Sequence, residues 1–167
     1  DLCASRGLGD VYKRQNEYYL TDLVEILAGK GVKITCIQAN PAEVLGANNK
    51  HELHELELIL RKMSAEKLLE QGVTLIDKTR VDVRGKVVAG KDCSIDVNVI
   101  LEGDVTLGNN VTIKSNVVLQ DVFIGDNSII ESFSHLSSAS VGSNCNIGPY
   151  ARIREGSEIG NNAKIGN

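Results

Sequence analysis

The sequence contains no tryptophan, and aromatic residues make up only 4% of the chain. Acidic residues outnumber basic ones by 22 to 18, which gives a net charge of −4 at pH 7. Surfaces that bind nucleic acids need a positive charge balance, because phosphate contacts dominate their affinity. We therefore expect no nucleic-acid partner.

Long hydrophobic runs are also missing. No stretch of the sequence is long and apolar enough to span a bilayer, and the N-terminus lacks the features of a signal peptide. These absences predict a soluble, cytoplasmic protein with no membrane partner.

What the sequence has instead is a six-residue repeat. From Val83 onward an aliphatic residue returns at every sixth position, with two steps of five residues, Leu119 to Ile124 and Leu136 to Val141. Helices have a period of 3.6 residues and strands a period of 2, so neither keeps a period of six, whereas hexapeptide β-helices do. Ordinary hairpins would show two-residue alternation and variable spacing. The recurring residues are Val83, Ala89, Ile95, Leu101, Leu107, Ile113, Leu119, Ile124, Ile130, Leu136, Val141, Ile147, Ile153, Ile159 and Ile165.

The other positions of the hexad agree with this geometry. Three hexads form one triangular coil of short parallel strands, in which the aliphatic residue points inward. The fifth residue also faces inward and is slim, with Phe123 as the bulky exception. The fourth lies at a corner, where Asn, Asp and Gly tolerate a left-handed backbone. The slim residues are Val87, Cys93, Val99, Val105, Val111, Val117, Ser128, Ser134, Ser140, Cys145, Ala151, Ser157 and Ala163. The corner residues are Asp92, Asn98, Asp104, Asn110, Asn116, Asn127, Asn144, Gly156 and Asn162.

The predicted fold is thus mainly β, a left-handed parallel β-helix of roughly four to five coils. The two five-residue steps should appear as tightened corners. Cys93 and Cys145 occupy slim positions, Cys36 falls in a predicted strand, and no pair of cysteines forms a CxxC motif. We expect these cysteines to be reduced, buried small residues.

Residues 1–15 differ in character from the rest of the chain. The segment Asp10-Val-Tyr-Lys-Arg-Gln15 resembles a translated transposase end of the kind used in sequencing-library adapters, so we expect 1–15 to be non-native. Residues 16–48 have the features of the C-terminal remnant of an α/β domain. Thr21 or Asp22 is a possible helix cap, Gly29 and Gly31 end that helix, and 32–38 alternates as a strand. Such a piece cannot bury a core alone, so we expect it to dock on about 200 further residues and the chain to be an internal fragment.

Residues 49–72 form the expected linker helix, and the β-helix follows over 73–167. Leu53, Leu56, Leu60 and Met63 make one apolar stripe, Asn48 or Asn49 is a plausible cap, and Gly72 ends the helix. His51 and His54 lie on one face at a spacing that can hold a metal. No third ligand lies nearby, so a solvated polar face is expected instead.

Four segments in this order carry a family resemblance. They are Asn16-Glu-Tyr-Tyr-Leu-Thr-Asp22, Gly46-Ala-Asn-Asn49, Ala65-Glu-Lys-Leu-Leu-Glu-Gln-Gly-Val73 and Ile147-Gly-Pro-Tyr-Ala-Arg-Ile-Arg154. From Asn16 onward the chain resembles the bacterial bifunctional N-acetylglucosamine-1-phosphate uridylyltransferase and glucosamine-1-phosphate N-acetyltransferase. The resemblance implies a homotrimer with an N-terminal nucleotidyltransferase domain, a helical arm and a left-handed β-helix whose acetyltransferase sites form between subunits.

The implied chemistry has two reactions. Acetyl-CoA acetylates glucosamine-1-phosphate, and UTP then transfers a uridylyl group to N-acetylglucosamine-1-phosphate, with Mg²⁺ as the metal. The product feeds peptidoglycan and lipopolysaccharide precursors.

Two site residues follow from the resemblance. Asn48 matches the asparagine that holds Mg²⁺ together with an upstream aspartate, and its side-chain oxygen is a hard ligand suited to that ion. Arg154 matches the arginine that binds the sugar phosphate, and its planar donor fork suits that task. Arg152 lies beside it, and Glu155 stands where the family has proline. The alternatives are helix capping for Asn48 and a solvated surface position for Arg154.

The resemblance places no catalytic residue within this chain. The nucleotide-binding loop should lie upstream of Asn16, and the catalytic histidine, its lysine and the acetyl-CoA contacts downstream of Asn167. His135 matches none of them, so we expect the chain alone to be inactive.

Two alternatives remain. One is another sugar-phosphate nucleotidyltransferase with a regulatory β-helix. The other is a γ-type carbonic anhydrase or a non-catalytic hexapeptide scaffold. Carbonic anhydrase needs three zinc histidines, and the coils offer only His135.

Overall fold

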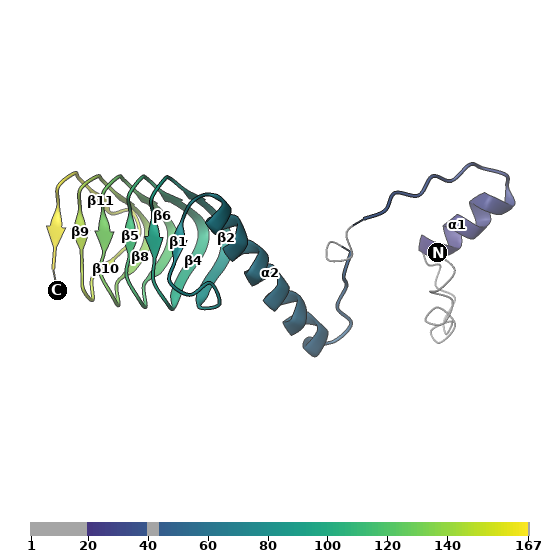
Figure 1. Cartoon of the computed structure of the whole chain (residues 1–167), viewed down its shortest axis with the longest axis horizontal. Coiled ribbons are helices and arrows are strands. Elements are labelled where there is room, and N and C mark those ends of the chain that lie inside the picture. Colours follow the sequence, from purple (N-terminus) through teal and green to yellow (C-terminus); the bar gives the residue numbers. More distant parts are fainter. Residues whose placement is uncertain (1–19, 40–43, 167) are drawn as a thin grey trace. The chain divides into compact units, whose positions relative to one another are not determined.

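The computed structural model describes residues 20–39 and 44–166, which divide into two units between residues 44 and 45. The first unit contains helix α1 (Leu20–Gly29), and the second contains helix α2 (Lys50–Glu70) and the β-helix (Figure 1). The segment 1–15, expected to be non-native, lies outside the described residues.

Helix α1 begins earlier than predicted. Thr21 and Asp22 lie inside its first turn, so neither is the cap, because helical structure already starts at Leu20. Asp22 there places a negative charge near the positive end of the helix dipole. The predicted end is confirmed, since the Val32 N–H donates to the Leu27 carbonyl at 3.1 Å across Gly31.

The strand predicted over 32–38 is wrong. Residues 32–39 are exposed and have no regular secondary structure, and the exposed residues include Cys36. A strand exists only when a second strand completes its hydrogen-bond ladder, and the described residues of this unit supply none. Alternating side chains in the sequence could not reveal that missing partner.

Helix α2 lies within the predicted linker helix 49–72, with Asn49 and Gln71 as its capping residues. The Asn49 side chain caps it by accepting from the Glu52 N–H at 2.9 Å, and the Asn49 amide donates back to Glu52 at 2.8 Å. At the other end Gly72 adopts φ +88°, and the Val73 N–H donates to the Leu68 carbonyl at 3.0 Å. This turn leads the chain directly into the first coil.

Only the second half of α2 packs on the β-helix. Ala65 and Leu68 are buried, and Arg61 forms an ion pair with Asp82 at 3.3 Å. In the predicted apolar stripe, Leu53 and Leu60 are instead exposed. Among the described residues, neither helix combines the length and apolar character needed to cross a bilayer.

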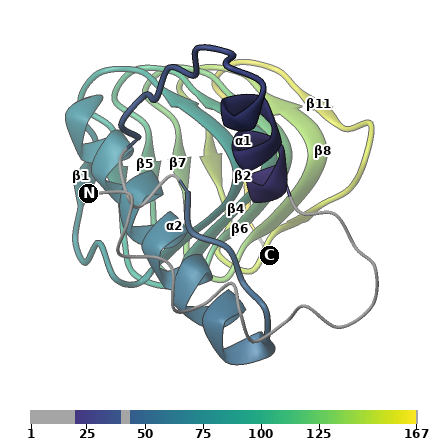
Figure 2. The same ribbon diagram turned by 90° about the vertical axis from the view of Figure 1, so that its right-hand side faces the viewer.

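The β-helix has parallel strands throughout. Six short strands form one face in the order β1-β3-β5-β7-β9-β12. The longer β2, β4, β6 and β8 bend around a corner and cover the two remaining faces, where β10 pairs with the first half of β8 and β11 with the second half. The strands are β1 (Thr74–Leu75), β2 (Val81–Ala89), β3 (Ser94–Ile95), β4 (Val99–Leu107), β5 (Thr112–Ile113), β6 (Val118–Ile124), β7 (Ile129–Ile130), β8 (His135–Val141), β9 (Asn146–Ile147), β10 (Arg152–Ile153), β11 (Glu158–Ile159) and β12 (Lys164–Ile165). Figure 2 looks nearly along this stack of coils. The predicted fold class, a left-handed parallel β-helix of about five coils, is confirmed.

The recurring aliphatic residues stack directly on one another inside the coils. Ile95, Ile113, Ile130 and Ile147 form one such column and are completely buried. Leu101, Leu119, Leu136 and Ile153 form the second column, and Leu107, Ile124, Val141 and Ile159 the third. The six-residue period therefore predicts correctly which residues form the buried core.

The slim positions are also as predicted, with two exceptions. At the five-residue steps the inward residues are Val122 and Ala139, and the predicted Phe123 and Ser140 face outward. Val122 is 2% exposed and Phe123 51%. Strand alternation fixes the inward residue two positions before the next aliphatic one, so a shortened step moves the slim position by one.

Polar side chains in slim positions bond to the next coil. The Cys93 thiol lies 3.0 Å from the Gly108 carbonyl oxygen, and the Cys145 thiol 3.2 Å from that of Gly160. The Ser128 hydroxyl donates to the Gly142 carbonyl at 2.9 Å. Both cysteines are free and buried, as predicted, whereas the prediction that Cys36 is buried is wrong, because that residue is exposed.

The corners adopt the left-handed conformation at every predicted residue except Asp104. There the preceding Gly103 takes φ +68°, because glycine bears this conformation without strain. In β4, Asp104 therefore lies between the bend at Gly103 and the inward Val105, whereas in β6 the inward residue directly follows the bend. The shortened coils bend at Asp121 and Ser138, which confirms the two tightened corners.

Candidate functional site

Arg154 lies on the outer surface of the β-helix, directly after β10. In-register pairing of β10 with β8 places Arg152 beside His135 and Ile153 beside Leu136. A groove of about 320 Å³ opens along these strands. It is lined by Gln120, His135, Ser137, Arg152, Ile153, Arg154 and Glu155.

The charges in this groove favour an anion. Within residues 20–39 and 44–166, neither Arg152 nor Arg154 forms an ion pair. On the opposite wall the Ser137 hydroxyl donates to the Gln120 side-chain oxygen at 3.1 Å, which leaves the Gln120 amide nitrogen as a further donor. Two guanidinium groups against the single carboxylate of Glu155 give the groove a net positive charge.

The proline-to-glutamate difference at Glu155 does not disturb the corner. Gly156 adopts φ +76°, and its N–H donates to the Ser138 carbonyl of the preceding coil at 2.8 Å. The Ser157 N–H closes the turn onto the Arg154 carbonyl at 3.2 Å. Arg154 is therefore carried by a regular corner of the β-helix.

Asn48 lies immediately before α2, next to the capping residue. Its backbone N–H donates to Glu52 at 2.7 Å, and its side-chain nitrogen donates to the same carboxylate at 3.2 Å. The backbone N–H is the main cause that lowers the pKa of Glu52 below its usual value, and the Asn49 and Asn48 side chains add to it against an opposing effect of desolvation. No described residue donates to the Asn48 side-chain oxygen, which is thus oriented away from Glu52 and available to a ligand.

The remaining metal-ligand candidates are not brought together. His51 and His54 are both exposed, and the part of the chain that the structure describes contains no group of three or more His, Cys, Asp or Glu side chains that could hold a metal. Leu58, four residues after His54, is also exposed on this face of α2. Asn48 can supply only one ligand of a metal site.

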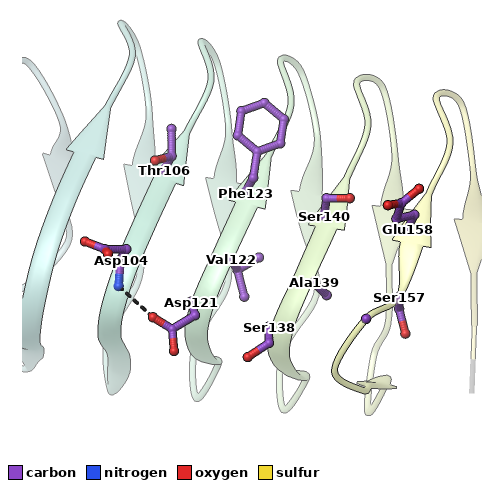
Figure 3. Close-up of a pocket in the computed structure, with 11 residues that line it drawn as sticks. Asp104, Thr106, Asp121, Val122, Phe123, Ser138, Ala139, Ser140, Ser157 and Glu158 are labelled. Carbon is purple, nitrogen blue, oxygen red and sulfur yellow. Dashed lines mark hydrogen bonds between the residues drawn. The ribbon is translucent and has the colours of Figure 1, made fainter.

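A second, larger groove of about 530 Å³ lies on the neighbouring face. Figure 3 shows Asp104, Asp121 and Ser138 along its corner, with Phe123 further along. At this corner the coils of β6 and β8 are each one residue shorter than the coil of β4. The surface over β6 and β8 is therefore recessed. The Asp104 N–H donates to the Asp121 carboxylate at 2.9 Å across this recess. The groove contains none of the predicted site residues, and its carboxylates would repel a phosphate.

The sequence interpretation missed His135, Gln120 and Ser137 as neighbours of Arg154. A spacing of 17 residues separates Arg154 from Ser137 and Arg152 from His135, which is one shortened coil. Counting back one coil from each arginine would have found His135 and Ser137, and counting back a second coil from Arg154 would have found Gln120.

A helical arm joined to a stack of parallel six-residue repeats defines the class of hexapeptide β-helix proteins. A protein-family profile described as "GMPPB C-terminal domain" matches residues 83–167. The chain belongs to this family.

Curated relatives extend the similarity to α2 and the residues before it. A protein named "Bifunctional protein GlmU" from Marinobacter nauticus is 46% identical over 154 residues, which is 92% of this chain and 34% of the relative. Proteins with the same name from Ralstonia pickettii and Idiomarina loihiensis are 55% and 51% identical over 98 and 96 residues, or 57% of this chain. The chain spans 21% to 34% of the length of these relatives. These relatives carry the name of the bifunctional family that the four sequence segments resemble.

Proposed function

We propose that this chain is part of a bifunctional transferase that makes UDP-N-acetylglucosamine in the cytoplasm. In one reaction acetyl-CoA acetylates glucosamine-1-phosphate, and in the other UTP transfers its uridylyl group to N-acetylglucosamine-1-phosphate. The product would supply peptidoglycan and lipopolysaccharide synthesis. The similarity to proteins named bifunctional GlmU, over 92% of the chain in one case, supports this proposal.

The observation that carries the proposal is the groove at Arg154. Arg152 and Arg154, which form no ion pair with any carboxylate among the described residues, lie beside the amide of Gln120 and suit the phosphate of a sugar phosphate. A guanidinium fork donates two parallel hydrogen bonds to phosphate oxygens, so Arg154 would fix the sugar's position as well as its charge. The acetyl acceptor would then lie on the outer surface of the coils.

Asn48 is the proposed Mg²⁺ ligand of the uridylyl transfer site. Its neighbour Asn49 performs the capping, and Glu52 holds its amide nitrogen, so its carbonyl oxygen can face a hard cation. The other ligands would include the aspartate that the family resemblance places before Asn16. When bound, Mg²⁺ neutralises the charge of the nucleotide phosphates during transfer.

The test is an assay of the longer protein that contains this chain. We expect it to acetylate glucosamine-1-phosphate and to produce UDP-N-acetylglucosamine from UTP, with the second reaction dependent on Mg²⁺. A nucleotidyltransferase with a regulatory β-helix would show the nucleotidyl reaction alone. That result would contradict the acetyltransferase half of the proposal and leave the β-helix with an assembly role.

A further inference from the structure

His135 is the outward neighbour of Arg152. The two residues are paired in register on β8 and β10, and both side chains are exposed. His135 lines the same groove as Arg154. Histidine is the side-chain type that can act as a proton-dependent cation near neutral pH.

The groups that face His135 set the sign of the effect. On β10 and directly after it stand Arg152, Arg154 and Glu155, and on the other side β6 supplies Val118 and Gln120, which do not titrate. A dianion bound in the groove would attract both guanidinium groups and would favour the positively charged form of the neighbouring imidazole.

We infer that His135 is a third cationic contact for the phosphate in this groove and that it takes up a proton when the phosphate binds. The inference rests on the proposed sugar-phosphate function of the groove. His135 is a binding residue here, with no part in bond making. Because binding and protonation are linked, the affinity for a dianion rises as the pH falls.

Sulfate is a suitable probe, because it remains a dianion throughout this pH range whereas phosphate does not. We would measure its dissociation constant for the 167-residue chain at pH 6 and pH 8, at constant ionic strength. One added charge near contact distance, partly screened by water, predicts a dissociation constant about 3- to 10-fold lower at pH 6. Calorimetry in buffers of different ionisation enthalpy should show net proton uptake on binding.

The matched variants are His135→Gln and His51→Gln. Both replace an exposed histidine, but His51 lies on α2 and outside the groove. His135→Gln should bind sulfate equally at both pH values and without proton uptake, while His51→Gln should behave as the unchanged chain. Glucosamine-1-phosphate should displace the sulfate, and coenzyme A should not.

The outcomes separate this inference from the proposed function. If Arg154→Gln abolishes sulfate binding but His135→Gln keeps the pH dependence, the role of His135 is wrong and the sugar-phosphate groove stands. If sulfate does not bind at either pH, both are wrong. Displacement by coenzyme A alone would overturn the assignment of the groove to the sugar phosphate.

Discussion

At the residue scale, the Asn49 side chain caps α2, whereas Asn48 is the proposed Mg²⁺ ligand. Replacing Asn48 with Ala in the full-length protein removes one neutral oxygen ligand, so uridylyl transfer should fall and require more Mg²⁺. Acetyl transfer should be unchanged. The measurement is the rate of each reaction as a function of Mg²⁺ concentration.

Asn49→Ala is the matched control for that experiment. Asn49 caps α2 through the Glu52 N–H, so its loss should destabilise the helix by about 1 kcal/mol without a special dependence on Mg²⁺. If Asn48→Ala instead lowers both reactions equally, its contribution is to the structure of the linker helix, and the metal assignment fails.

The reverse result is expected for Arg154→Ala. Loss of a charged hydrogen-bonding partner should weaken the use of glucosamine-1-phosphate by about 2 to 4 kcal/mol, and leave uridylyl transfer unchanged. The 21-residue helix α2, about 32 Å long, separates the two positions, so a double variant should show additive effects. Acetyl transfer that remains normal would remove Arg154 from the site.

The sequence predicts some residues of the candidate sites and misses others. The family segments pointed to Asn48 and Arg154, but only the structure assigns the cap to Asn49, since either asparagine fits a helix start. The neighbours His135 and Ser137 were not predicted, because contacts between coils depend on the exact length of each coil. A shortened step changes only the spacings that span it, as between His135 and Arg152, and the later pair Asn146 and Lys164 is again 18 residues apart.

At the scale of elements, a glycine follows some of the inward aliphatic residues and allows adjacent coils to approach closely. A Cβ at Gly142 would lie 2.7 Å from the Asn161 backbone nitrogen, whereas at Gly160, in the same hexad position, nothing lies within 4 Å. Gly142→Ala should therefore lower the free energy of unfolding of the 167-residue chain by about 1 to 3 kcal/mol, and Gly160→Ala by less than about 0.5 kcal/mol. Urea unfolding of both variants measures this, and equal costs would show that the coils can separate to accept a methyl group.

The elements themselves illustrate what a repeat can predict. The six-residue period located the inward columns and both tightened corners, because the residues that must be buried are the aliphatic ones that define the period. It misassigned Phe123, Ser140 and Asp104, since it could not show on which side of a corner a residue is omitted or added. The strand expected over 32–38 failed for another reason, namely that a strand depends on a partner elsewhere in the chain.

At the scale of the whole molecule, the homotrimer implied by the family remains a proposal. Val88, Thr106 and Phe123 lie in register on one outer face, and Val88 and Phe123 are 47% and 51% exposed. Exposed apolar side chains aligned in this way favour contact with a second copy. We expect the chain to self-associate and Phe123→Ser to weaken that association, as measured by light scattering over a range of concentrations.

Phe133→Ser is the control, since Phe133 is similarly exposed but sits at a corner, stacked on Tyr150 with ring centres 5.1 Å apart. It should associate as the unchanged chain does. Association that survives Phe123→Ser would indicate contact through another surface of the β-helix. A strict monomer at high concentration would contradict both routes.

In the 167-residue chain, the two ends of the β-helix are buried to different extents. Leu68 of α2 joins the core at the first coil, whereas Ile159 and Ile165 in the last coil are only partly buried. Each coil is held by its neighbours alone, so a coil with one neighbour opens at the lowest cost. Backbone amides should therefore exchange with deuterium fastest near Ile165, more slowly at Ile147 and slowest around Ile113, as if the chain unwound from one end. Uniform exchange along the coils would mean that the whole β-helix opens as a single cooperative unit.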